Sequence, residues 1–305
     1  MTLPSSNAAE QKSLAARLGY PENARVLVIN GDDSGMCHAA NVGTIEALEH
    51  GVMTTSTIMV PCPWFSEMAD YARKNPARDL GIHLCHTSEW HFYKWGPVAP
   101  KEKVPGLVDP EGFLWPSIEE VYSKSTPEEA LEEGRAQIRR ALASGVDVTH
   151  LDSHMGTLQL NPKFIEPYLK LAVEFDLPVR MASQETMERF QQGGLRDKFA
   201  AQGILFTDYF VYEELKDEPK DVKGFWTRIV KNLKPGVTEF YVHAGKPNEE
   251  LQAITGTWKT RGAEYELMAN DAEFRKLLDD QGIVRIGYRP IRELQRKLRS
   301  SGTSK

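Results

Sequence analysis

Short apolar runs alternate along the chain with longer segments of helical periodicity. Residues 26–29 are Val-Leu-Val-Ile, and four successive apolar residues indicate a strand that is buried on both faces. Further runs of this character lie at 56–60, 80–85, 146–152, 178–182, 204–208, 237–242 and 284–288. Eight strands separated by helices predict a parallel β/α architecture.

Helices are predicted between the strands, at 8–18, 38–50, 64–75, 126–144, 161–175, 224–233 and 270–280. The clearest helix start is at Thr126, because Thr126 and Glu129 match a capping box and Pro127 suits the first helical position. Asn270 is the expected cap of the last of these helices. The highly charged segment 216–223 indicates a solvated loop.

The alternation and the length favour an α/β fold of the (β/α)-barrel class, TIM-like and either complete or distorted, with residues 1–305 in one domain. An open, doubly wound sheet is the alternative. That fold needs a phosphate-binding glycine loop after the first strand, and Gly-Asp-Asp-Ser-Gly at 31–35 is a different pattern. Asn30 and Gly31 are expected to end the first strand.

A long segment, 86–125, interrupts the alternation and is rich in aromatic residues, among them Trp90 and Trp95. A loop of this length in a compact domain is typically a lid or a binding loop. An irregular insertion that is packed by its own aromatic side chains is the alternative.

Polar residues fall at the ends of several predicted strands. They are Asp32 and Asp33 after the first strand, His83 in the third, Asp152 and His154 at the fourth, and His243 after the seventh. The carboxyl ends of the strands in a β/α barrel meet at one face, so these side chains are expected to converge. Taken singly, the aspartates also suit a solvated turn or a helix cap, and each histidine also suits a hydrogen-bonded core position.

Asp33, His83 and His154 make a set of two imidazoles and one carboxylate, which leaves coordination positions open at a catalytic metal. Alternation along the strand requires only that one of the two neighbouring aspartates faces that metal. Asp32 could then accept a proton from water, and His243 could donate one to a leaving group.

Four more polar residues are candidates for supporting roles. His150 lies four residues before His154, but the segment has the pattern of a strand, so we expect His150 and Asp152 to orient His154 rather than to bind metal. His38 and Asn41, one helical turn after the aspartate pair, are expected to line the site.

At these residues the sequence resembles the YdjC/ChbG-like carbohydrate deacetylases, relatives of the polysaccharide deacetylases. The segment 30–35 with His38 and Asn41 is similar to the opening N-A-D-D-F-G, 81–84 to G-L-H-L, and 150–154 to H-x-D-S-H. The late strand that ends at His243, followed by Arg261 and Glu264, is also similar to the family, and the resemblance spans residues 24–290.

This resemblance implies a (β/α) barrel and one divalent metal ion bound by Asp33, His83 and His154, with Asp32 as general base and His243 as acid. Two imidazoles favour zinc, and magnesium or another divalent ion is the alternative. The chain departs from the family in having Gly156 where many members have a third histidine of the H-x-D-S-H-x-H segment, Ala244 where many have proline, and Ser34 where the opening has phenylalanine.

The function expected is therefore metal-dependent deacetylation of a small N-acetylated carbohydrate, with Trp90 and Trp95 stacking on sugar rings and Arg261 near the substrate. A metallohydrolase for another amide or ester, and a carbohydrate-binding protein without catalysis, are the alternatives.

Composition narrows the setting. The chain is 41% hydrophobic and 26% charged with a net charge of −6, which disfavours a nucleic-acid partner, and no apolar run has the length of a membrane span. The first residues lack the regions of a secretory signal, and three cysteines without C-x-x-C spacing indicate free thiols. We expect a cytoplasmic protein with no membrane partner, and a homodimer is compatible with the sequence.

Overall fold

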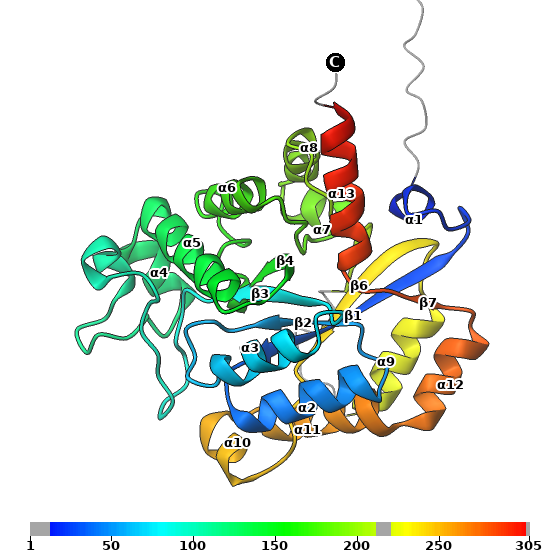
Figure 1. The fold of residues 1–305 in the computed structure, drawn as a ribbon, viewed down its shortest axis with the longest axis horizontal. Coiled ribbons are helices and arrows are strands. Elements are labelled where there is room, and N and C mark those ends of the chain that lie inside the picture. Colours follow the sequence, from blue (N-terminus) through cyan, green and yellow to red (C-terminus); the bar gives the residue numbers. More distant parts are fainter. Residues whose placement is uncertain (1–12, 212–220, 303–305) are drawn as a thin grey trace, which may run out of the picture.

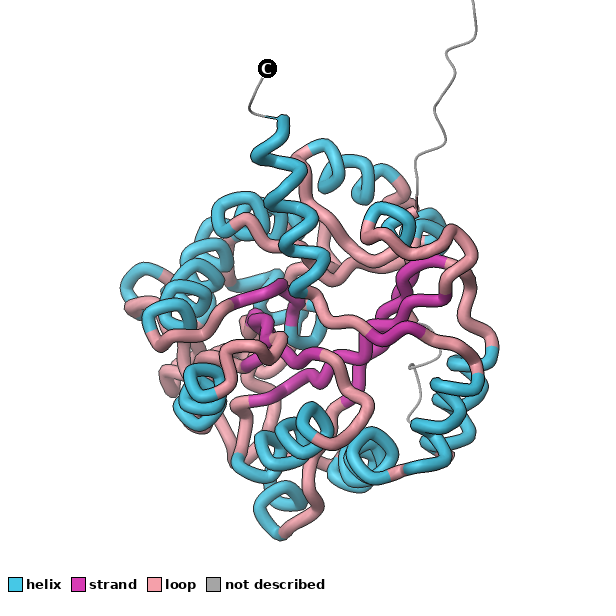
Figure 2. The backbone as a smooth tube through the Cα atoms, turned by 45° about the vertical axis from the view of Figure 1, so that its right-hand side comes forward, coloured by secondary structure: helices cyan, strands magenta, loops and turns pink. Residues whose placement is uncertain are grey.

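A curled sheet of parallel strands forms the centre of the structure, a computed structural model that describes residues 13–211 and 221–302 (Figures 1 and 2). The strands are β1 (Arg25–Ser34), β2 (Thr55–Ile58), β3 (Leu80–Leu84), β4 (Val148–Ser153), β5 (Tyr209–Phe210), β6 (Gly236–Val242) and β7 (Val284–Arg285). The order in the sheet is β4-β3-β2-β1-β6-β5, and β7 pairs with β1. All these pairings are parallel, so the carboxyl ends of the strands lie at one end of the sheet.

Strand β1 is buried on both faces, as its apolar run predicts. Leu27 and Ile29 pack in the main hydrophobic core, whereas Val26 and Val28 belong to a second apolar cluster. Successive side chains of a strand point to opposite faces, so this division shows that β1 separates two apolar layers.

The expected end of β1 at residues 30–31 was wrong. The strand continues to Ser34, which pairs with Ile58 of β2 after an irregular register between Gly31 and Ser34. Asp33 has a φ of 64°, in the left-handed region that few residues other than glycine adopt. The irregularity changes the direction of the chain at the aspartate pair and presents both carboxylates at the end of the strand.

The barrel is distorted because two of the predicted strands do not form regular ladders. The segment 178–182 contributes only one bridge, between Val179 and Leu151 of β4, and the amide of Val179 donates to the carbonyl of Leu205 at 3.1 Å. The segment 204–208 is not a strand, and β5 follows it directly. These segments nevertheless connect the two ends of the sheet, because Val179 bridges to β4 and Leu205, which Val179 contacts, leads into β5. The strands therefore curl into a partial barrel, as the alternation predicts (Figure 2).

The last strand also departs from an ideal barrel. Strand β6 pairs with β1 from Arg25 to Gly31 and so occupies one edge of β1 over that length. Strand β7 is limited to Val284–Arg285, although 284–288 was predicted, and it pairs with Val26 and Leu27 of β1. Since a strand has two edges, β7 shares the other edge of β1 with β2 and does not stand between β6 and β1.

Helices surround the sheet (Figure 1). They are α1 (Leu14–Arg17), α2 (His38–Glu49), α3 (Phe65–Lys74), α4 (Ile118–Lys124), α5 (Pro127–Ala143), α6 (Ile165–Phe175), α7 (Gln184–Arg189), α8 (Gly194–Ala201), α9 (Val222–Lys231), α10 (Glu249–Ile254), α11 (Trp258–Tyr265), α12 (Ala272–Asp280) and α13 (Arg289–Gly302). The capping box of Thr126 and Glu129 at the start of α5 is confirmed. None of the helices in the described ranges has the length and apolarity needed to cross a bilayer.

Several helix predictions need correction. Helices α4, α7, α8, α10, α11 and α13 were not predicted, and the loop 86–125 contains α4 and two short 3₁₀ turns. The cap of α12 is Asp271, whose side chain accepts from the amide of Phe274, and not Asn270. The predicted helix 8–18 and the charged loop 216–223 fall partly outside the described residues; within them, α1 begins at Leu14, and Lys223 lies in α9.

The second apolar cluster fills the barrel near the amino ends of the strands. It contains Val26 and Val28 of β1 with Leu14, Ala15, Leu205, Val237, Ile286, Tyr288 and Ile291. Further along the same face of β1 follow Asn30 and Asp32, both buried. The barrel interior therefore changes from apolar to polar toward the carboxyl ends of the strands, where the candidate site lies.

Candidate active site

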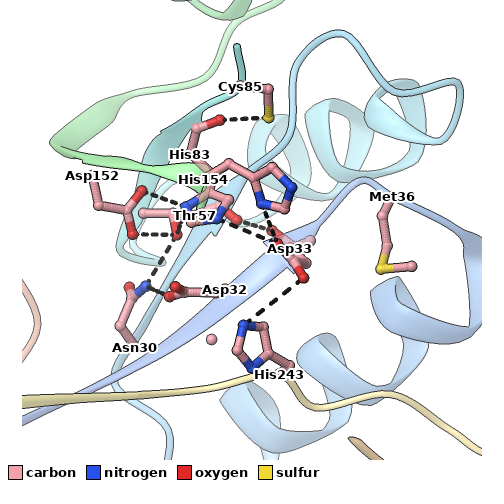
Figure 3. A network of polar contacts seen from close by, with 12 residues as sticks. Asn30, Asp32, Asp33, Met36, Thr57, His83, Cys85, Asp152, His154 and His243 are labelled. Carbon is pink, nitrogen blue, oxygen red and sulfur yellow. Dashed lines mark hydrogen bonds and ion pairs between the residues drawn. The ribbon is translucent and has the colours of Figure 1, made fainter. Parts of the chain in front are cut away.

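Three of the predicted site residues meet at the carboxyl end of the sheet (Figure 3). Oδ1 of Asp33 lies 3.3 Å from Nε2 of His83 and 3.3 Å from Nδ1 of His154. All three side chains are buried, and their potential ligand atoms lie within 4.8 Å of one another. Within the described part of the chain, Oδ1 of Asp33 receives no hydrogen bond. A buried carboxylate oxygen without a donor, facing two ring nitrogens, is the arrangement that a metal ion would complete.

The charges around this cluster favour a cation. Burial alone would lower the pKa of both imidazoles, but Asp152 and Asp32 raise the pKa of His83 to about 10, and Glu89 with Asp33 raises that of His154 to about 9. Positive charge on either ring is thus stabilised by nearby carboxylates. A divalent ion would occupy the same field in place of the two protons.

Asp152 supports His83 and not His154, contrary to the sequence-based expectation. Oδ1 of Asp152 lies 2.7 Å from Nδ1 of His83, and its Oδ2 accepts from the hydroxyl of Thr57 at 2.8 Å. The reason is register, because Asp152 pairs directly with His83 across β3 and β4. A carboxylate on the far nitrogen fixes the ring and its tautomer so that the other nitrogen faces Asp33.

Glu89 takes the corresponding position at His154. Its carboxylate lies 2.9 Å from Nε2 of His154, and it belongs to the long loop 86–125. Sequence reasoning missed Glu89 because a single glutamate in a loop without periodicity carries no signal. The loop thus contributes to the site through a carboxylate as well as through its aromatic residues.

Arg261 contacts the third member of the cluster. Its Nη2 donates to Oδ2 of Asp33 at 2.7 Å, and its Nε donates to the hydroxyl of Thr257. Burial would raise the pKa of Asp33, but Arg261 and the two histidines outweigh it and hold that pKa well below its usual range. Asp33 therefore stays ionised, with Oδ2 bound to Arg261 and Oδ1 facing the rings of His83 and His154.

Asp32 is held by a buried arginine that was not among the predicted site residues. Arg180 donates to both carboxylate oxygens of Asp32 at 2.7 Å, and it also contacts Asp152 and Glu239. Burial would raise the pKa of Asp32, but Arg180 lowers it to about 2. A charged residue inside the apolar run 178–182 was the available signal for Arg180.

These contacts bear on a second acidic group. Asp32, His83 and Asp152 also offer ligand atoms within 4.8 Å of one another. However, both oxygens of Asp32 and one of Asp152 face the Arg180 guanidinium. An arginine already neutralises that group, so the set with Asp33 is the better metal site.

His150 lies outside the cluster of Asp33, His83 and His154. Its Nε2 is 3.3 Å from Oδ1 of Asn30, whose amide donates to Asp32, and its ring stacks on Tyr288 at 3.9 Å. Burial and Arg180 keep the pKa of His150 well below its usual value. His150 is thus a neutral ring that acts on Asp32 through Asn30, and it does not orient His154 as expected.

The remaining two candidates for lining the site do not line it. His38 is half exposed and contacts Glu67 of α3, with Nδ1 2.9 Å from Oε1. Asn41 is buried and accepts from the amide of Gly35, while its own amide group donates to Glu67. Neither side chain reaches the cavity. Asn41 shapes the turn that follows the aspartate pair, and His38 is a surface residue.

His243 lies on the other side of Asp33 from His83 and His154 (Figure 3). Its Nε2 is 3.9 Å from Oδ2 of Asp33, and its amide donates to the carboxylate of Glu264 at 2.7 Å. Burial and Arg261 lower the pKa of His243. The ring is therefore neutral at rest.

Glu264 supplies a test of this electrostatic description. Burial raises the pKa of Glu264 to about 7 from an ordinary value of 4.5. The folded state thus binds this proton more tightly than the unfolded state, so its contribution to stability is complete below pH 4.5 and is lost as the pH rises through 7.

In chelator-treated protein, Glu264→Gln should reduce the stability lost between pH 5 and pH 8 by roughly 3 kcal/mol, measured by urea unfolding. Parallel pH profiles for the two proteins would contradict this assignment.

A cavity of about 690 Å³ opens over these residues. Its lining includes Asp32, Asp33, His83, Glu89, Trp90, His154, Arg180, His243, Arg261 and Glu264. Trp90 lines the cavity, and its ring centroid is 5.7 Å from the guanidinium of Arg261. Trp95 does not line it and packs against Trp90 at 5.2 Å. Trp95 is therefore a support for the aromatic loop and not the sugar-stacking residue that was expected.

A family model described as YdjC-like protein matches residues 26–280, which include the whole cluster. The chain belongs to the YdjC-like family. The resemblance to this family that the sequence shows is thereby confirmed.

Relatives of this YdjC-like protein cover nearly the same length. The carbohydrate deacetylase of Thermus thermophilus is 31% identical, with 92% of this chain and 98% of the relative aligned. The chitooligosaccharide deacetylase of Yersinia enterocolitica is 30% identical over 87% of this chain and 96% of its own. A crystal structure of an Enterococcus faecalis protein proposed to cleave cellobiose phosphate is 28% identical, with a TM-score of 0.76 over 88% of this chain and 99% of that one.

Proposed function

We propose that this YdjC-like protein is a metal-dependent hydrolase that removes the acetyl group from an N-acetylated amino sugar. The observation that carries the proposal is the buried Oδ1 of Asp33, which receives no hydrogen bond in the described chain and faces one nitrogen each of His83 and His154. The relatives named carbohydrate deacetylases support the reaction and the class of substrate.

The donor set fits a divalent ion. Asp33, His83 and His154 would hold it, with Asp152 and Glu89 on the outer nitrogens of the two rings. Two imidazoles and one carboxylate suit zinc or a similar transition ion better than magnesium, which prefers oxygen ligands. When bound, such an ion supplies Lewis-acid polarisation of the amide carbonyl and lowers the pKa of water.

Two groups of the chain can move protons at this site. Asp32 is ionised across the neutral range and is the proposed acceptor of the proton from the attacking water. Arg180 fixes the direction of that carboxylate with two hydrogen bonds, so the base is positioned at the cost of some basicity.

His243 is the proposed donor to the departing amine. The ring is neutral at rest, so it must gain a proton before it can give one away. Negative charge that develops on the substrate beside it would raise its pKa during the reaction, while Glu264 holds its backbone in place.

The test of the proposed function is acetate release from N-acetylglucosamine and N-acetylated chitooligosaccharides. The wild-type protein should release acetate, and His83→Ala should not. Phe92→Ala is the control. Phe92 lies in the loop that follows the strand of His83, is 83% exposed and does not line the cavity. Turnover of ester substrates alone would favour a different hydrolase, and absence of turnover with every substrate would favour a binding protein.

Trp90 should contribute mainly to substrate binding. We expect Trp90→Ala to raise KM about two- to tenfold with little change in kcat, because stacking stabilises the bound sugar and the transition state alike. Trp95→Ala should instead lower the melting temperature, since Trp95 is buried against its neighbours. Steady-state kinetics and thermal unfolding of both variants separate the two roles, and an unchanged KM in Trp90→Ala would return the loop to a passive role.

A further inference from the structure

Part of the cavity lining is apolar and has no role in the proposed reaction. This part consists of apolar side chains from the segment after β4, from the segment that contains α7, and from β5. We call this part the apolar wall, and it comprises Met155, Leu160, Met181, Met187, Phe190 and Phe210. Methionine side chains are flexible and polarisable, which suits contact with an apolar group of variable shape.

Exposure marks the apolar wall as a surface that is made for contact. The large apolar side chains that are exposed in the described residues are Trp64, Phe92, Leu142, Met155, Leu160, Val173, Phe190 and Leu298. Three of them, Met155, Leu160 and Phe190, lie together at this one cavity, between 46% and 54% exposed. Grouped exposed apolar residues indicate a binding surface, whereas single ones are ordinary.

Three polar side chains near the apolar wall are engaged in contacts within the protein. The hydroxyl of Tyr168 donates to the backbone carbonyls of Leu151 and Arg180, and the amide of Gln159 donates to the carbonyl of Arg180. The guanidinium of Arg180 is itself covered by the ring of Phe210 at 5.3 Å. These donors are engaged within the protein, so they are poorly placed to bind sugar hydroxyl groups.

Gly156 helps to form the wall. It has a φ of +66°, and a Cβ at this position would lie 3.1 Å from Cγ and Cδ1 of Leu160. A side chain here would be strained and would press on Leu160. Glycine at 156 thus leaves room for Leu160 at the surface next to His154.

We propose that the apolar wall binds an apolar substituent of the substrate, so that the protein hydrolyses the amide of an amino sugar that carries a hydrophobic group. This inference rests on the proposed hydrolysis of the amide of an amino sugar and adds the class of substrate. The apolar group is either an N-acyl chain longer than acetyl or a hydrophobic aglycone.

The test compares kcat/KM for four compounds: N-acetylglucosamine, N,N′-diacetylchitobiose, octyl N-acetyl-β-glucosaminide and N-octanoylglucosamine. Each methylene that is fully buried contributes about fourfold, so we expect a gain of at least about tenfold for one octyl compound. A higher kcat/KM for octyl N-acetyl-β-glucosaminide would identify a hydrophobic aglycone as the bound group. A higher kcat/KM for N-octanoylglucosamine would identify the N-acyl chain. Equal values for all four, or the highest value for chitobiose, would overturn the inference.

Two variants connect the gain to the wall. Phe190→Ala and Leu160→Ala should lose most of the preference for the octyl compound, whereas Phe92→Ala, the same change at an exposed aromatic residue that does not line the cavity, should keep it. Binding of octyl β-glucosaminide, which has no amide to cleave, is measured in parallel by isothermal titration calorimetry. If no substrate is hydrolysed, but octyl β-glucosaminide binds and Phe190→Ala weakens that binding, the proposed function fails and the apolar site stands. If acetate is released without an octyl preference, the opposite holds.

Discussion

Replacement of Asp32 by asparagine is expected to reduce turnover by about two to four orders of magnitude while leaving the metal content unchanged. Asparagine keeps the shape of the side chain but cannot take a proton from water. Asp32 does not belong to the proposed metal-binding set of Asp33, His83 and His154. Both oxygens of its carboxylate accept hydrogen bonds from Arg180. Metal analysis after dialysis and acetate release on the same preparation are the measurements.

The neighbouring substitution is the matched control. Asp33→Asn should lose most of the bound metal, and excess metal should restore part of its activity, because an amide oxygen is a weaker ligand than a carboxylate. A metal-free Asp32→Asn protein that excess metal rescues, beside an inactive Asp33→Asn protein that retains metal, would reverse the two roles. Near wild-type rates in both would place the site elsewhere.

Arg180→Met is expected to destabilise the protein by about 3–5 kcal/mol, the largest effect on folding that the site predicts. Removal of the guanidinium leaves the buried carboxylates of Asp32, Asp152 and Glu239 without their shared counterion. Methionine has a similar length, so a cavity contributes little. Equilibrium unfolding in urea gives the free energy change.

The control for this variant is an arginine near the surface. Arg135 makes an ion pair with Glu174 at 2.8 Å, and Arg135→Met should cost no more than about 1 kcal/mol, since water compensates the exposed carboxylate. Equal losses for Arg135→Met and Arg180→Met would show that the buried carboxylates do not depend on Arg180.

The parts of the fold that sequence predicts are those with local causes. The apolar run at 26–29 forms the buried centre of β1, and Thr126 and Glu129 cap α5, because burial on both faces and a capping box depend on adjacent residues. The segments 178–182 and 204–208 have equally good strand patterns. They fail to form ladders because register is set by neighbours distant in the chain.

The same distinction applies to the site. Asp33, His83 and His154 are predictable because each lies at or just after the carboxyl end of a strand. The partners of these residues are not, since Glu89 comes from an irregular loop and Asp152 is assigned to His83 by cross-strand pairing. The positions of Asp33, His83 and His154 thus follow from topology. The residues that contact them follow from packing that a sequence pattern does not encode.

The most direct test of the central claim, a catalytic metal held by Asp33, His83 and His154, is metal titration of stripped protein during acetate release. We expect activity to fall to background when a chelator removes the metal and to return with one equivalent of zinc or another divalent ion per chain. His154→Ala should fail to recover under the same titration. Full activity in protein shown by elemental analysis to be metal-free would contradict the account.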